Sequence, residues 1–260
     1  MGLTYEQRGS GPPLVLLHGL GHRRQAWHPV LDRLTPHRTV ITVDLPGHGD
    51  SPPLRAADGH TAVTAIAAAV FALFDGLGLD RPHVAGNSLG GALALIAGAR
   101  GRAATVTALS PAGFWAHRWH FGYAKATFMS AQLAGSVVRP AVPALARSTA
   151  GRWLMDGAFV ARPSRMPAEQ AVADAAAFFA ARRAVRAVLA DRVSFAEAMP
   201  PGVPMTIAWG DRDHLLPPSQ ARVARLRLPE ARFVSLPGCG HVPMTDDPAL
   251  VASVLLEGSA

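Results

Sequence analysis

The chain has 260 residues, of which 49% are hydrophobic and 17% charged, with a formal net charge of +7 and a single cysteine. This length and apolar content suffice to bury a large core in one domain, with or without an insertion, and exclude a disordered chain. The positive charge lies mostly in residues 114–200, which hold 11 basic and five acidic side chains. Those arginines are scattered and no zinc-finger or RNP motif accompanies them, so we expect no nucleic-acid partner.

Apolar runs that are typical of buried strands alternate with helical patterns along most of the chain. Continuous apolar or β-branched runs predict strands at 12–19, 38–47, 83–85, 104–111, 203–210 and 231–238. Helical spacing of apolar residues predicts helices at 23–34, at 61–78, directly after residue 88, and at 247–256. Such alternation indicates an α/β fold: a doubly wound, mostly parallel sheet with helices on both faces.

Residues 114–200 break this alternation. They contain no convincing strand and indicate several helices separated by prolines, the clearest at 167–192. Eleven of the 17 aromatic residues fall in this third of the chain, which favours a helical cap, or lid, inserted between two late strands. The alternative is that a helical subdomain simply needs its own apolar core. We predict a core of residues 1–113 and 201–260 and a cap of residues 114–200.

The segment "HVAGNSLGGALALI" (83–96) places one serine among three glycines where a strand turns into a helix. In a parallel sheet, ligands bind beyond the carboxyl ends of the strands, and a serine at such a corner points its hydroxyl into that crevice. The turn is tight, and Gly86, Gly90 and Gly91 relieve the crowding around it. The pattern G-x-S-x-G in this setting makes Ser88 a candidate nucleophile.

A serine hydroxyl needs a base to take its proton, and the base needs an acid to orient it. Among the 11 histidines, His241 stands out because "PGCGHVPMTDDP" follows the last predicted strand at the same sheet edge. The segment "AWGDRDHLLPP" follows the strand before and offers Asp211 and Asp213 as the acid. The chain order serine, acid, histidine is the one expected for a nucleophile on such a turn.

The pieces "LLHGLG", "VDLPGHGDS", "GNSLGG", "WGDRDHLLP" and "GCGHVPMTDDP" resemble the α/β-hydrolase superfamily over nearly the full length, in its serine-nucleophile, esterase-like branch. The family pattern G-x-x-D-x-x-x-P, from Gly210 to Pro217, selects Asp213 as the acid and leaves Asp211 as a neighbour. The resemblance also implies that the backbone N–H groups of Leu20 and Leu89 form the oxyanion hole. It implies a structural role for the loop 44–49, and a chain that begins at the family's second strand without the first, edge strand.

The resemblance implies a hydrolase for a carboxylic ester, thioester or lactone, with a small-molecule acyl substrate and an acyl-enzyme intermediate. One alternative is a carbon–carbon bond hydrolase of the meta-cleavage-product type, suggested by the "GNS" turn but not by Val242 after His241. Another is a receptor-like relative that binds a ligand without turnover. Cys239 is a second candidate nucleophile, although the simpler interpretation is that cysteine occurs there because the tight loop requires a small residue. No zinc spacing, P-loop or dinucleotide pattern occurs, so we expect no metal or cofactor.

The first residues contain no apolar signal region, and Glu6 does not fit the myristoylation pattern. The longest apolar run, 65–74, is too short to span a bilayer. One cysteine suits a reducing compartment, so we expect a cytoplasmic protein without a membrane span. Two possibilities stay open for the basic residues of 114–200: they face the mouth of an apolar pocket and favour anionic substrates, or they are solvated surface.

Overall fold

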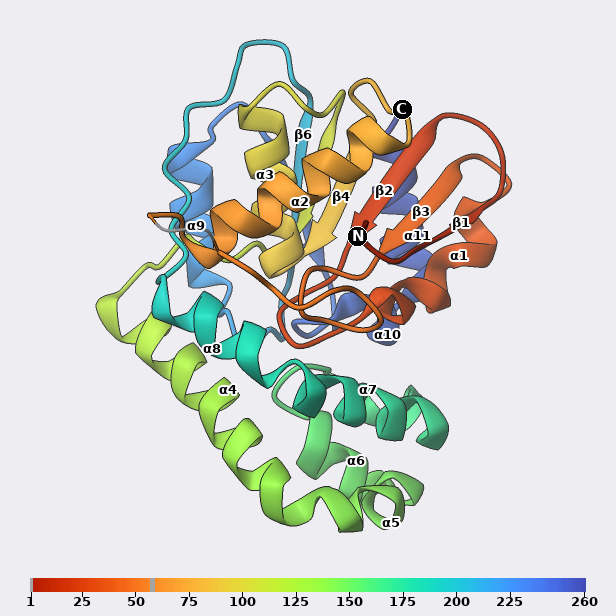
Figure 1. Cartoon of the computed structure of the whole chain (residues 1–260), viewed down its shortest axis with the longest axis vertical. Helices are drawn as coiled ribbons and strands as arrows, with labels where there is room; N and C mark the ends of the chain where they lie inside the picture. The colour runs from red at the N-terminus through yellow and green to blue at the C-terminus, as the bar shows by residue number, and fades with distance from the viewer. Residues whose placement is uncertain (1, 57–58) are drawn as a thin grey trace.

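The computed structural model describes residues 2–56 and 59–260, and in these residues one seven-stranded sheet has the order β1-β3-β2-β4-β5-β6-β7. Its first strand is antiparallel to β3, and all other neighbours are parallel. The mostly parallel α/β sheet predicted from the sequence is confirmed (Figure 1). The strands are β1 (Tyr5–Arg8), β2 (Pro13–Leu17), β3 (Thr39–Val43), β4 (His83–Asn87), β5 (Val106–Leu109), β6 (Met205–Gly210) and β7 (Arg232–Leu236).

The strand β1 is absent from the sequence prediction. Its sequence, YEQR, is polar and mostly exposed, because an antiparallel strand at a sheet edge need not bury either face. The buried strands behave as expected: every residue of β6 is buried. In β2, Val15 and Leu17 join one apolar cluster whereas Leu14 and Leu16 join another, as the alternation of side chains along a strand requires.

Helices cover both faces of the sheet. In Figure 1 α2 and α3 lie in front of the strands and α11 lies behind them. The helices outside residues 114–200 are α1 (His28–Leu34), α2 (Ala62–Gly76), α3 (Leu89–Ala99), α9 (Ser219–Arg227), α10 (Pro243–Asp246) and α11 (Pro248–Glu257), with a 3-10 turn η1 (Arg24–Trp27). The side chains of Thr61 and Asp247 cap the N-termini of α2 and α11, which is why both helices begin where the sequence indicates.

The five helices within residues 114–200 lie together beyond one end of the strands, at the bottom of Figure 1, and are called the cap below. They are α4 (Arg118–Val138), α5 (Val142–Arg147), α6 (Thr149–Asp156), α7 (Ala168–Ala180) and α8 (Arg182–Ala190), with 3-10 turns η2 (Arg139–Ala141) and η3 (Pro163–Arg165). The two ends of this segment meet, because Trp115 Nε1 donates to the Val193 carbonyl at 2.6 Å and Phe195 N donates to that of Gly113 at 3.3 Å. This arrangement is consistent with an insertion between β5 and β6, and the boundaries 114–200 stay a prediction.

The single helix predicted at 167–192 is wrong: the helix is interrupted at Ala181 and continues as α8. The two parts have different partners. Helix α8 buries Val185 and Val188 in the apolar cluster that it shares with α2 and α3, whereas α7 turns Phe178 and Phe179 toward a cavity. Because periodicity alone describes only one amphipathic face, it does not reveal this change of partner.

Candidate active site

Ser88 lies on the sharp turn between β4 and α3, with φ 57° and ψ −114°. Few residues other than glycine adopt a positive φ, so the backbone is strained at the candidate nucleophile. The neighbouring glycines are required by close packing. A Cβ atom on Gly86 would lie 2.2 Å from the Gly90 carbonyl carbon, and one on Gly90 would lie 2.0 Å from the Leu17 carbonyl oxygen. The turn therefore presses α3 against β2 and β4, and Ser88 sits at its tip.

Gly90→Ala is expected to lower the free energy of unfolding by about 3 kcal/mol or more, since the added methyl group has no space and meets backbone rather than a flexible side chain. The matched control is Gly122→Ala in α4, where an added Cβ has no neighbour within 4 Å. That change should stabilise the protein by roughly 0.5–1 kcal/mol through helix propensity. Urea unfolding measures both, and equal effects would contradict the crowding argument.

His241 and Asp213 lie in the loops after β7 and β6, and the structure brings them together. The His241 Nδ1–H group donates to Asp213 Oδ2 at 2.8 Å. The other carboxylate oxygen, Oδ1, accepts hydrogen bonds from the amides of Leu215 and Leu216 at 3.0 and 2.8 Å. Both side chains are buried. The carboxylate is thus held by two amides and fixes the imidazole with its Nε2 atom free to act as a base.

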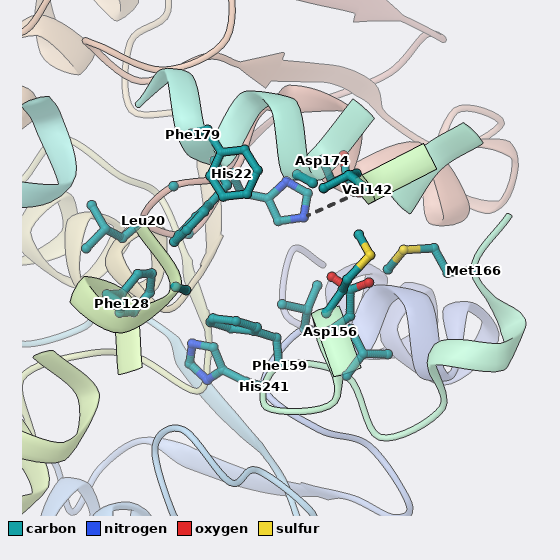
Figure 2. Close-up of a pocket in the computed structure, with 18 of the residues that line it drawn as sticks. Leu20, His22, Phe128, Val142, Asp156, Phe159, Met166, Asp174, Phe179 and His241 are labelled. Carbon is teal, nitrogen blue, oxygen red and sulfur yellow. Dashed lines mark ion pairs between the residues drawn. The ribbon is translucent and has the colours of Figure 1, made fainter. Parts of the chain in front are cut away.

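Ser88 and His241 line the same cavity, which has a volume of about 350 Å³. The Nε2 atom of His241 is buried and has no hydrogen-bond partner among the described residues. A buried imidazole nitrogen without a partner is costly unless a substrate or a reacting group completes it. Figure 2 shows His241 at the edge of the cavity, beside the ring of Phe159.

The backbone amides of Leu20 and Leu89 are both unused within the described chain: neither donates a hydrogen bond there. Leu89 is the first residue of α3, where amides lack helical acceptors and the helix dipole favours negative charge. Leu20 follows Gly19, on which a Cβ atom would lie 3.3 Å from Ser88 Cβ. Both amides therefore belong to the immediate surroundings of Ser88.

His18 orients the peptide that carries the Leu20 amide. Its Nε2 atom accepts a hydrogen bond from Leu45 N at 3.0 Å, so its Nδ1–H group donates to the Gly19 carbonyl at 2.8 Å. Burial, reinforced by the nearby His48, holds the pKa of His18 well below its usual value, so the ring is neutral. In a trans peptide the N–H group points opposite to the carbonyl, so this contact directs the Leu20 amide away from His18.

The sequence analysis did not identify two residues that hold the serine turn and the histidine loop in place. Asn87, directly before Ser88, donates through Nδ2 to the carbonyls of His241 at 2.8 Å and Leu109 at 3.2 Å, and so joins the serine turn to the histidine loop. The buried Asp246 accepts from the amides of Gly240, Ala161 and Arg162 at 2.8, 3.0 and 2.6 Å, respectively. The histidine loop is thereby attached to the cap as well as to the sheet.

The contacts of Asp211, Cys239 and Asp44 indicate structural roles for these three residues. Asp211 is exposed and accepts from the Gly238 amide at 2.7 Å. Cys239 is fully buried, and burial raises the pKa of its thiol to about 12, so it is not a thiolate at neutral pH. Asp44 accepts from the amides of Arg24 at 2.6 Å and Asp50 at 3.0 Å and from the Arg24 guanidinium, which organises the loop 44–49.

The cavity lies between the sheet edge and the cap and is mostly apolar. Val138 and Leu154 line it and are 39% and 78% exposed, so it opens at the outer surface of α4 and α6. Among its lining residues in the described chain there is no arginine or lysine. Its ionisable side chains are His22, Asp156, Asp174 and His241.

Among His22, His117 and His120, only His22 lines the cavity. At the start of α4, His117 stacks with Trp119 at 6.4 Å between ring centroids, and His120 contacts Trp119 edge-on at 4.2 Å. In the described part of the chain, no cluster of His, Cys, Asp or Glu is arranged to hold a metal ion, and no helix is long and apolar enough to cross a membrane.

Comparison with known proteins agrees with this arrangement. Residues 14–254 match the model of the alpha/beta hydrolase family. The chain is 30% identical over 258 residues to an uncharacterised protein of Mycobacterium tuberculosis, covering 93% of this chain and 73% of that protein. It is 29% identical over 257 residues to the pimeloyl-[acyl-carrier protein] methyl ester esterase of Aeromonas salmonicida, covering 95% of each.

Among solved structures, a membrane phospholipase A described as a bacterial virulence factor has a TM-score of 0.76 at 27% identity, covering 99% of this chain and 83% of that chain. The family match extends from β2 into α11 and so includes the serine turn, the cap and the histidine loop. This chain therefore belongs to the alpha/beta hydrolase family.

Proposed function

We propose that this protein is a serine hydrolase that cleaves a carboxylic ester, thioester or lactone through an acyl-enzyme intermediate. The observation that carries the proposal is the convergence on one cavity of Ser88, on its strained turn, and His241, whose Nδ1 is bonded to Asp213 at 2.8 Å. The ester chemistry of the Aeromonas salmonicida relative, which aligns over 95% of both chains, gives further support.

The proposed mechanism gives each of these groups a defined role. Ser88 Oγ attacks the carbonyl carbon while His241 Nε2 takes its proton, and Asp213 stabilises the imidazolium. The amides of Leu20 and Leu89 donate to the oxyanion, each contributing about 10²–10³ in rate. His241 then returns its proton to the leaving oxygen or sulfur as the bond to carbon breaks. Water, activated by the same histidine, releases the acyl group and regenerates Ser88.

The cavity predicts a preference for acyl groups of several carbons. Its wall is largely made of aliphatic and aromatic side chains, and each methylene buried there contributes about 0.8 kcal/mol, or roughly a fourfold gain in binding. We expect kcat/KM for p-nitrophenyl esters to rise from acetyl through butyryl to hexanoyl. A steady fall from acetyl onward would show that the chain does not enter this cavity.

Reaction with an alkyl phosphonate separates hydrolysis from mere ligand binding. An activated serine forms a covalent phosphonate adduct, which mass spectrometry of the peptide that contains Ser88 would detect. Labelling that Ser88→Ala abolishes supports the serine mechanism. Absence of both labelling and ester turnover would favour the receptor-like alternative. Labelling with turnover only of a vinylogous 1,5-diketone would favour the carbon–carbon bond hydrolase.

A further inference from the structure

One wall of the otherwise apolar cavity carries two carboxylates, to which the proposed mechanism assigns no role. Asp156 is the last residue of α6, and Asp174 lies in α7. Figure 2 shows both on the cavity wall, with His22 beside Asp174 and Met166 near Asp156. The two carboxylates come from the cap, whereas Ser88 and His241 come from the sheet edge. They are therefore placed to contact the part of a substrate that extends away from the scissile bond.

Only one of the two carboxylate oxygens of Asp174 accepts a hydrogen bond from the described residues. Arg23 Nε donates to its Oδ1 at 3.1 Å, and the side chain is 10% exposed. Its other oxygen, Oδ2, is buried and accepts no hydrogen bond from the described residues. The Nε2 atom of His22 lies 4.0 Å from that oxygen, which is beyond hydrogen-bond distance. A buried carboxylate oxygen without a donor is costly, which points to a ligand that supplies one.

Asp156 is less satisfied still, because none of its described neighbours donates a hydrogen bond to its carboxyl group. Arg152, one turn earlier on α6, donates instead to the carbonyls of Ala146 at 2.7 Å and Pro163 at 3.2 Å. Burial, and then the charge of Asp174, raise the pKa of Asp156 to about 7. At the C-terminus of α6 the helix dipole also favours a cation over an anion.

We propose that Asp156 and Asp174 bind an ammonium group at the end of the substrate chain, so that the enzyme acts on esters whose acyl or alcohol part carries a distal primary amine. This inference deepens the proposed function: the amine-bearing molecule is a substrate only if the protein is the proposed hydrolase. The binding of the ammonium group does not depend on that function. An ammonium group supplies three donors and one positive charge, which match the unfilled acceptors and the two acidic groups. A distal carboxylate would instead meet two like charges.

This assignment replaces the idea that arginines of the cap select anionic substrates. No arginine lines the cavity within the described residues, and Arg23, which lies behind Asp174, is already engaged by it. The groups that face Asp156 are Asp174 of α7 and Arg152 of α6, with His22 and Arg23 behind Asp174. Of these groups, Asp156, Asp174 and His22 line the cavity whereas Arg23 and Arg152 do not, so the charged oxygens that a ligand meets at this end are those of the two carboxylates.

Ammonium binding should depend on pH in a defined direction. Below pH 7 Asp156 is mostly protonated and neutral, and above pH 7 it is mostly a carboxylate, whereas an alkylamine stays cationic throughout. If the ammonium binds only the ionised form, its affinity should rise about tenfold from pH 6 to pH 8, following the ionised fraction. At pH 7 binding should release about half a proton, because Asp156 is then half protonated.

Titration calorimetry of the full chain with hexylamine, hexanol and hexanoate tests the proposal without any turnover. We expect hexylamine to bind at least about tenfold more tightly than hexanol at pH 8, and hexanoate to bind most weakly. Proton release at pH 7 follows from measurements in buffers of different ionisation enthalpy. Equal binding of the three ligands, or stronger binding of hexanoate, would overturn the assignment.

Asp156→Asn should remove the preference for hexylamine, its pH dependence and the proton release, while hexanol binding stays within about twofold because the apolar wall is intact. Unchanged hexanol binding also shows that the variant is folded. The matched control is Glu169→Gln, an exposed carboxylate on the same helix as Asp174, which should change none of these values. A pH dependence that survives in Asp156→Asn would assign the titration to another group and refute the proposal.

Failure of the amine-binding proposal can be distinguished from failure of the proposed hydrolase function. If hexylamine binds as expected but no ester is cleaved and Ser88 is not labelled by phosphonate, the cavity is an amine site without turnover. If esters are cleaved but the amine shows no preference, the hydrolase stands and the acidic wall has no role in selectivity. Only amine preference together with faster cleavage of 6-aminohexanoyl than of hexanoyl thioesters supports both.

Discussion

Ser88→Ala should lower kcat for the best p-nitrophenyl ester by about 10⁶, to the background that the remaining amides and binding groups sustain. The loss is large because serine, histidine and acid act as a unit, and none of them compensates for the missing nucleophile. The backbone cost of φ 57° is shared by serine and alanine, so the turn itself should be unchanged. Initial rates at saturating ester, with thermal unfolding as a check of the fold, measure the effect.

Ser110→Ala is the matched control for this experiment. Ser110 directly follows the neighbouring strand β5, has a positive φ of 42°, and is buried, as Ser88 is. Its hydroxyl oxygen has no hydrogen-bond partner in the described structure, so its removal should leave kcat within about threefold and stability nearly unchanged. Retention of more than about a hundredth of the activity in Ser88→Ala would remove Ser88 from the proposed role.

The sequence predicts the sheet and the serine turn well because their signals are local. The apolar run before Ser88 and the glycines around it lie within a few positions, and the steric reason for Gly86 and Gly90 is visible in the packing of the turn itself. Strand β1 was not predicted because its four residues are polar, lie at an exposed sheet edge and form no apolar pattern. The interruption of the helix at Ala181 was not predicted because both halves of 167–192 are amphipathic and differ only in what they contact.

The polar contacts of the cavity could not be predicted because they join residues far apart in the chain. Asp174 meets Arg23 across 151 positions, and Asn87 reaches the carbonyl of His241 across 154. No motif surrounds Asp156 or Asp174, whose sequence neighbours are ordinary helix residues. The sign of the charge at the cavity was also open from composition alone, since the arginine-rich segment 114–200 contributes only two ionisable side chains to the described lining, the carboxylates of Asp156 and Asp174.

Asp213→Asn should lower kcat/KM for the same ester by about 10⁴, the scale of loss when the catalytic histidine takes the wrong tautomer. The structure gives the reason. The amides of Leu215 and Leu216 both point at Oδ1, so an asparagine must keep its carbonyl oxygen there and turn its NH₂ group toward His241 Nδ1. The imidazole then accepts at Nδ1 and carries its proton on Nε2, where it no longer takes a proton from Ser88.

Asp211→Asn is the matched control, two positions away and outside this network. Its side chain accepts one hydrogen bond, from the Gly238 amide, and the carbonyl oxygen of asparagine accepts that bond equally well. We expect kcat/KM to change by less than about threefold, as is usual for an exposed residue that keeps its contact. Steady-state rates of the two variants, with far-ultraviolet circular dichroism to verify folding, decide the assignment. A larger loss in Asp211→Asn than in Asp213→Asn would mean that the orienting acid is Asp211, and that the 2.8 Å contact of Asp213 with His241 serves the fold alone.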